Sequence, residues 1–113
     1  MRNVIEIEGH KAVVAFDPEI ALFRGEFIGL NGAADFYARS VDELVAEGRT
    51  SLRVFLDLCR ERNLSPLRTY SGRFNVRLDP ETHRDAALAA AAESKSLNEW
   101  VADAIAAAAK DVA

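Results

Sequence analysis

The stretch SGRFNVRLDP, residues 71–80, constrains the fold of this chain more than any other. Polar and apolar residues alternate strictly from Arg73 to Leu78, and successive side chains of a β-strand point to opposite faces. Phe74, Val76 and Leu78 therefore share one face of a predicted strand. No second strand pattern follows it, and an unpaired strand exposes a row of backbone donors and acceptors. The strand must find its partner outside this part of the chain.

Two helices are expected after this strand. Asp79 and Pro80 are typical of the N-cap and the first position of a helix, and the alanine-rich tract 86–92 is a strong helix former. Ser96 and Glu99 form an S-x-x-E capping box that begins a second helix. The predicted inward-facing residues are His83, Ala86, Ala87 and Ala90 in the first helix, and Leu97, Val101, Ala104, Ile105 and Ala108 in the second.

A two-fold symmetric dimer solves the problem of the unpaired strand. Two copies of RFNVRL can pair antiparallel, with their apolar faces over a shared core of four helices. Symmetry then places Arg73, Asn75 and Arg77 of both chains on the opposite face. Arginine and asparagine carry the forked groups that match base edges, and a two-stranded ribbon fits a DNA major groove. These three residues are the predicted base-contacting set.

The first two thirds of the chain predict a small α+β unit. NVIEIEG, KAVVAF and FRGEFIGL have strand patterns, DFYA is a candidate for a short additional strand, and FDPEIAL and LNGAA supply turns. Ser40 and Glu43 then form a capping box for a helix that ends near Asn63, before Ser65-Pro66. Its apolar stripe includes Gly48, which indicates close packing against the sheet. We place the domain boundary in the following connector, giving domains 1–66 and 67–113.

Charge is distributed unevenly along the chain. The net charge is −4 overall and −3 over residues 1–66, which disfavours a polycation that coats nucleic acid. Residues 68–77, in contrast, hold three arginines and no acidic residue. DNA binding is therefore expected only from the local ribbon. No segment has the ~20 apolar residues that cross a bilayer, and no signal peptide is recognisable, so we expect a soluble cytoplasmic protein that does not enter membranes.

Catalysis, metals and cofactors are not expected. Cys59 is the only cysteine and fits a buried small hydrophobe, while His10 and His83 have no ligand partners at metal-binding spacing. The acidic residues that could serve a two-metal nuclease are Glu6, Glu8, Asp17 and Glu26. They lack a phosphate loop or a nucleophile–base pair, and we predict no enzymatic activity.

The strand-helix-helix pattern resembles the ribbon-helix-helix DNA-binding proteins, and the whole chain resembles a HicB-family antitoxin. The resemblance rests on FRGEFIGLN, RSVDELVAE, YSGRFNVRLDPETH and KSLNEWVADAI. It implies a degraded ribonuclease-H-type sheet followed by a ribbon that binds operator DNA, and repression of the protein's own operon. It also implies that backbone amides around Ser96, Leu97 and Asn98 hold a DNA phosphate. Ser94 stands where such proteins commonly have glycine between the two helices.

The resemblance further implies that the amino-terminal domain binds and silences a HicA-like RNA-cleaving toxin. An RNA-cleaving partner must be basic, which suits the acidic residues 1–66. The candidate apolar anchors are Phe23, Phe27, Phe36 and Tyr37, although each ring could instead fill the core under the helix. The alternative is a ribbon-helix-helix regulator whose amino-terminal domain senses a protein or ligand and has no toxin partner.

Overall fold

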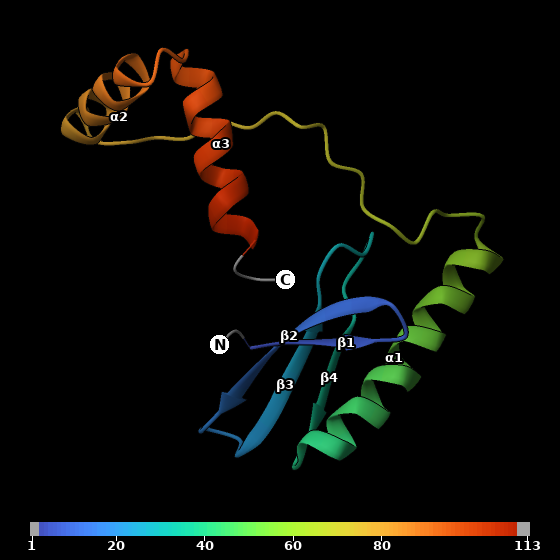
Figure 1. Cartoon of the computed structure of the whole chain (residues 1–113). Helices are drawn as coiled ribbons and strands as arrows, with labels where there is room; N and C mark the ends of the chain where they lie inside the picture. The colour runs from blue at the N-terminus through green and yellow to red at the C-terminus, as the bar shows by residue number, and fades with distance from the viewer. Residues whose placement is uncertain (1–2, 111–113) are drawn as a thin grey trace. The chain divides into compact units, whose positions relative to one another are not determined.

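The computed structural model describes residues 3–110, which divide into two compact units, residues 3–71 and the residues from Gly72 onward. The first unit contains a sheet and the long helix α1, and the second contains the shorter helices α2 and α3, as can be followed in Figure 1. The division falls a few residues beyond the expected boundary at 66/67. Each unit is described by itself.

The first unit is built on an antiparallel sheet of four strands in the order β1-β2-β3-β4. These are β1 (Val4–Ile7), β2 (His10–Asp17), β3 (Leu22–Phe27) and β4 (Asp35–Ala38). Each strand pairs with the next one in sequence, as the short turns between them require. The strands predicted in this unit are confirmed, and DFYA is the fourth. The strand predicted at residues 73–78 is not formed in the single chain, where this segment has no paired neighbour strand.

Helix α1 (Val41–Glu61) follows the sheet and begins where the capping box predicted. The Ser40 hydroxyl accepts a hydrogen bond from the Glu43 backbone N–H at 3.2 Å. At the other end Asn63 adopts a left-handed conformation with φ 54°, and the Leu64 N–H bonds to the Cys59 carbonyl at 2.8 Å. Asparagine tolerates this conformation better than most residues, which explains why the helix ends here.

The core of the first unit lies between α1 and one face of the sheet. Its buried residues are Ile7, Ala12, Phe27, Leu30, Ala34, Phe36, Ala38, Leu44 and Leu52. The Phe36 ring lies between two glycines, Gly25 of β3 and Gly48 of α1. A Cβ atom on Gly25 would overlap the ring, and one on Gly48 would lie 2.5 Å from Ile7 and 3.0 Å from Phe36. The expected close approach of α1 at Gly48 is confirmed.

The connector after α1 packs along the first unit before the chain leaves it. Leu67 forms an isolated antiparallel bridge with Leu30, and the Arg68 N–H donates to the Gly29 carbonyl at 2.9 Å. The Asn31 N–H donates to the Pro66 carbonyl at 2.8 Å. Residues 66–68 therefore belong structurally to the amino-terminal unit.

The second unit contains α2 (Pro80–Ala92) and α3 (Leu97–Ala109). The Ser96 hydroxyl caps α3 by accepting from the Glu99 N–H at 3.1 Å, as predicted. Asp79 occupies the N-cap of α2, but its side chain makes no capping hydrogen bond. The N-cap position of Asp79 was predicted correctly, but the capping hydrogen bond that an aspartate usually makes there is not formed.

A Schellman motif ends α2. The Lys95 N–H bonds to the Ala90 carbonyl at 2.9 Å, and the Ser94 N–H bonds to the Ala91 carbonyl at 3.1 Å. Ser94 adopts φ 56°, the left-handed conformation that favours glycine. The turn keeps this geometry although serine occupies the position.

We predict that Gly48→Ala destabilises the first unit by about 1–3 kcal/mol because its methyl group overpacks the contact between α1 and the sheet. This loss opposes the gain of about 1 kcal/mol that alanine normally brings to a helix interior. Urea unfolding followed by circular dichroism measures the difference, with the exposed Glu47→Ala in the same helix as control. An equal or higher stability of Gly48→Ala would show that α1 can move away from Phe36 at no cost.

Candidate nucleic-acid interface

The extended segment before α2 carries an exposed apolar row. Residues 73–79 lie outside every helix and strand of the described chain. Phe74, Val76 and Leu78 are 70%, 56% and 47% exposed. Three large apolar side chains at alternate positions are therefore left in solvent by a single copy of the chain.

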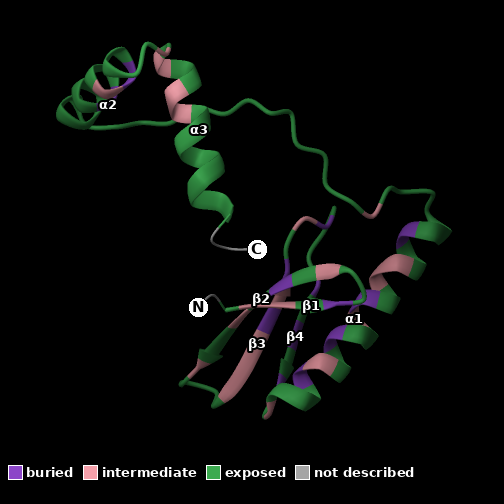
Figure 2. Cartoon of the chain, in the orientation of Figure 1, coloured by how far each residue is buried: buried purple, intermediate pink, exposed green. Residues whose placement is uncertain are grey.

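The helices behind this segment give it no core of their own. Ala86 and Ala90 are the only buried residues of α2, and α3 has none among its described residues (Figure 2). Of the expected inner positions, His83 and Ala87 on α2 and Ala104 and Ala108 on α3 are exposed in the single chain. On α3, Leu97 and Val101 are half-buried, and Ile105 is 43% exposed.

Two open grooves separate the extended segment from the helices. The first has a volume of about 660 Å³, and its apolar lining includes Val76, Leu78, Leu97 and Val101. The second has a volume of about 760 Å³ and is lined by Phe74, Val76, Val101 and Ile105, among others. Both grooves therefore run along the apolar row that a single chain leaves uncovered.

The polar residues of the segment alternate with this row. Arg73, Asn75 and Arg77 are all exposed. The segment thus presents two guanidinium groups and one amide within five residues. These groups can donate forked hydrogen bonds to phosphates or to base edges.

The beginning of α3 contains the three residues that were expected to hold a DNA phosphate, Ser96, Leu97 and Asn98. The Ser96 hydroxyl accepts a hydrogen bond from the Glu99 N–H, and the Trp100 N–H donates to the Ser96 carbonyl at 3.0 Å. The first N–H groups of a helix, here those of Leu97 and Asn98, have no partner within the helix. Asn98 is exposed and lines the second groove, near the extended segment. The three residues expected to hold a phosphate thus lie together at one helix end.

Side chains around the α2–α3 turn form contacts that the sequence analysis missed. The Trp100 indole N–H donates to the Glu93 carboxylate at 2.7 Å, and the Lys95 ammonium lies 2.9 Å from the Asp103 carboxylate. Glu93 and Trp100 are seven residues apart, and Lys95 and Asp103 eight apart, on either side of the turn. These spacings predict a contact only when the geometry of the turn is known.

The four aromatic anchors expected in the amino-terminal domain separate into two groups. Phe27 and Phe36 are only 4% exposed and pack against each other with ring centroids 5.0 Å apart. Their rings fill the core under α1, which removes them from the candidate toxin-contact set. Phe23 is half-buried and Tyr37 is 43% exposed, so these two still reach the surface.

Tyr37 belongs to a charged cluster on the sheet face opposite α1. Arg24 donates to the Tyr37 hydroxyl at 3.2 Å, to Asp35 at 2.6 Å and to Glu26 at 3.3 Å. The hydrogen bond to Asp35, followed by that to Tyr37, raises the pKa of Arg24. All four side chains come from paired positions of β3 and β4, with Arg24 opposite Tyr37 and Glu26 opposite Asp35, so the sheet register assembles the cluster.

The described residues, 3–110, contain no cluster of three or more histidine, cysteine, aspartate or glutamate side chains that could hold a metal ion. Cys59 is buried as expected. Within the same range no helix combines the length and the apolar character needed to span a bilayer.

Comparison with known families gives one match. Residues 55–105 match the model of the HicB family, from the second half of α1 through the connector and α2 into α3. Comparisons with curated proteins and with solved structures found no match. The match covers less than half of the chain, and it includes the extended segment and the α2–α3 turn.

Proposed function

We propose that this protein is the antitoxin of a toxin–antitoxin pair, that it binds operator DNA as a ribbon-helix-helix dimer, and that it represses its own operon. The observation that carries this proposal is the exposed apolar row of Phe74, Val76 and Leu78 beside two open grooves. The HicB-family match over residues 55–105 supports it.

The burial of side chains in the carboxy-terminal unit supports the dimer. Two helices joined by two buried alanines remove little apolar surface from water, whereas fixing their backbone costs roughly 1–2 kcal/mol for each residue. A second copy supplies what is missing. Its extended segment can pair antiparallel with the first, and the two apolar rows then face the grooves along α3. The backbone groups of residues 73–78 gain ladder partners in the same step.

The DNA interface follows from the dimer. Pairing two alternating segments with their apolar rows inward leaves Arg73, Asn75 and Arg77 of both copies on the outer face. A two-stranded ribbon of this kind fits the major groove. The beginning of α3 then holds a backbone phosphate through the amides around Asn98, where the helix dipole favours an anion.

Toxin binding is assigned to the amino-terminal unit. Its open sheet face carries Asp35 and Glu26 around Arg24, with Tyr37 at 43% exposure beside them. The acidic balance of residues 1–66 suits a basic partner, and Tyr37 offers an apolar ring with a polar end. The partner we propose is a HicA-like RNA-cleaving toxin.

We predict that Phe74→Ala destabilises the dimer by about 3 kcal/mol or more, because it removes a ring that pairing buries. Tyr70→Ala is the matched control, since the two rings are almost equally exposed in the single chain, at 69% and 70%. Sedimentation velocity over a dilution series, with thermal unfolding, measures the effect. A folded wild-type monomer at micromolar concentration, or equal effects of the two substitutions, would contradict the dimer.

We predict that Arg73→Ala and Arg77→Ala each lower operator affinity by about 1–3 kcal/mol and relax sequence preference at one position. Arg84→Ala, which removes an exposed α2 arginine outside the segment, should have a smaller effect that does not depend on sequence. Binding to randomised duplexes, read by sequencing, measures both quantities. Unchanged affinity and preference in Arg77→Ala would show that the segment does not face DNA.

We predict that residues 1–71 co-purify with the small basic protein encoded next to this gene and stop its RNA cleavage. The fragment ends at residue 71 because Leu67 and Arg68 bond to the first unit. Tyr37→Ala should weaken inhibition, whereas Tyr70→Ala should not. If the fragment folds and the neighbouring protein stays free and active, the amino-terminal unit serves a sensing role and the protein is a regulator without a toxin.

A further inference from the structure

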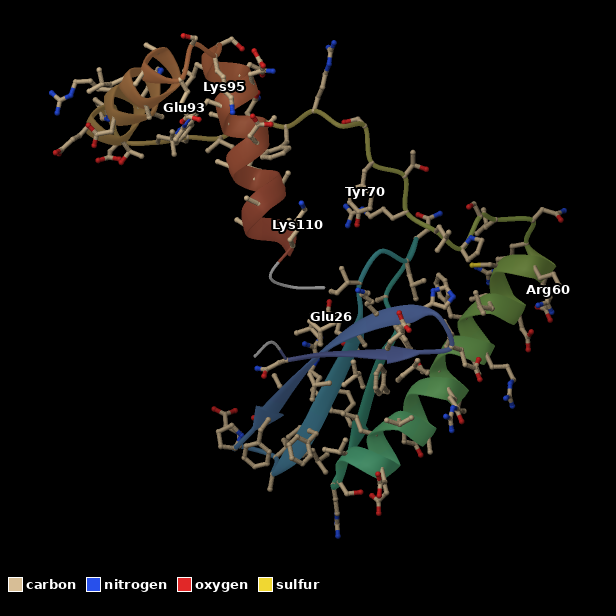
Figure 3. All side chains as sticks on the ribbon, viewed as in Figure 1. Glu26, Arg60, Tyr70, Glu93, Lys95 and Lys110 are labelled. Atoms are coloured by element: carbon tan, nitrogen blue, oxygen red, sulfur yellow. The ribbon has the colours of Figure 1, made fainter. Side chains whose placement is uncertain are left out.

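Four side chains form a connected set of polar contacts around the turn between α2 and α3, here called the turn clasp: Glu93, Lys95, Trp100 and Asp103. The Trp100 indole donates to Glu93 at 2.7 Å. The Lys95 ammonium lies 2.9 Å from Asp103 and 3.5 Å from Glu93. Figure 3 labels Glu93 and Lys95 at this turn.

The turn clasp joins the end of one helix to the beginning of the next. Glu93 is the C-cap of α2, and Lys95 lies in the turn. Trp100 and Asp103 come from the first two turns of α3. The four side chains therefore brace the turn in addition to its backbone hydrogen bonds, which include the one at left-handed Ser94. They fix the direction in which the first turn of α3 points.

If only its charge were considered, Lys95 would be taken for a phosphate-binding residue. A lysine just before a helix that holds a phosphate is expected to contact the phosphate itself. In the structure its side chain is 33% exposed, less than its partners Glu93 at 53% and Asp103 at 61%. The hydrogen bond to Asp103 also raises the pKa of Lys95. Its charge is compensated by two carboxylates at the turn.

We propose that the turn clasp is a positioning device for DNA binding, in which Lys95 orients the beginning of α3 and does not itself bind phosphate. This inference rests on the proposed DNA-binding function. The amides of Leu97 and Asn98 reach a phosphate only if the first turn of α3 keeps its direction relative to the extended segment. The turn clasp holds that direction through contacts on both sides of the turn.

The expected effect is modest for one chain and larger for the dimer. Exposed ion pairs and hydrogen bonds are weak, and losing one lowers affinity by roughly threefold. A dimer carries two turn clasps, one at each phosphate, so the two losses multiply to about tenfold. A tenfold change in affinity is readily measured.

Asp103→Ala distinguishes a phosphate-binding Lys95 from a positioning Lys95, because the two roles predict opposite changes in DNA affinity. The substitution removes a negative charge near DNA and places a better helix former in α3, so a phosphate-binding Lys95 predicts equal or tighter binding. The turn clasp predicts binding about tenfold weaker. Trp100→Phe, which changes no charge, and Lys95→Met should weaken binding by a similar factor.

The matched control is Asp85→Ala, which removes an exposed carboxylate from α2 outside the turn clasp. It should bind DNA as tightly as the wild-type protein or slightly more tightly. The probe is a duplex spanning the region immediately upstream of the gene, with a scrambled duplex of equal length for comparison. All variants are measured at one salt concentration, and each is first shown to be a folded dimer. Asp103→Ala binding as tightly as Asp85→Ala would overturn the proposal.

A second readout does not depend on DNA. Trp100 is the only tryptophan, so its indole N–H gives one resonance in an NMR spectrum of the full chain. We expect Glu93→Ala and Lys95→Met to shift that resonance and speed its exchange with water, and Asp85→Ala to leave it unchanged. An unaltered resonance in Glu93→Ala would overturn the turn clasp itself.

The two readouts also separate this proposal from the proposed function. If wild-type protein does not prefer the upstream duplex, DNA repression and the positioning role both fail, whatever the indole resonance shows. If wild-type protein prefers that duplex and the turn-clasp variants bind like Asp85→Ala, only the positioning role fails.

Discussion

The small size of the alanine side chain is the constraint on which the carboxy-terminal unit depends. Alanine makes α2 and α3 good helices, but only Ala86 and Ala90 are buried between them. The larger apolar groups lie in the extended segment, where Phe74 is 70% exposed. The residues that form the helices and the large residues that could form a core thus lie in different parts of the sequence. In the dimer that we propose, the apolar segment of a second copy supplies the core that the two helices lack.

The amino-terminal unit solves the same problem within one chain. Its sheet and α1 approach closely because Gly25 and Gly48 leave space for the Phe36 ring between them. The large side chain comes from β4, the edge strand, and the two small residues come from its neighbours in the fold. This packing uses one face of the sheet and leaves the other, with Arg24 and Tyr37, open to solvent. One chain therefore combines a unit that has its own buried core with a unit whose large apolar side chains stay exposed in a single copy.

Local patterns predicted the four strands of the sheet and the three helices well, but not the strand expected at residues 73–78, and they predicted side-chain contacts poorly. The serines at 40 and 96 cap their helices because a hydroxyl and an N–H three residues on meet in almost any helix start. Alternation also places Phe36 on one face of its strand, but it cannot tell whether a helix covers that face. The pairing of Trp100 with Glu93 depends on the turn at Ser94, and no local pattern contains it.

The exposed row at Phe74, Val76 and Leu78 has a consequence for how long a copy of the chain survives. Extended backbone with exposed apolar side chains is the form of chain that proteases and chaperones recognise, and their action follows the population of such open forms. A single copy presents this segment continuously, and pairing in the proposed dimer would hide it. The rate of degradation per copy would then rise as the concentration of the protein falls. In a growing cell, degradation would add to dilution, and the protein would disappear faster than growth alone dilutes it.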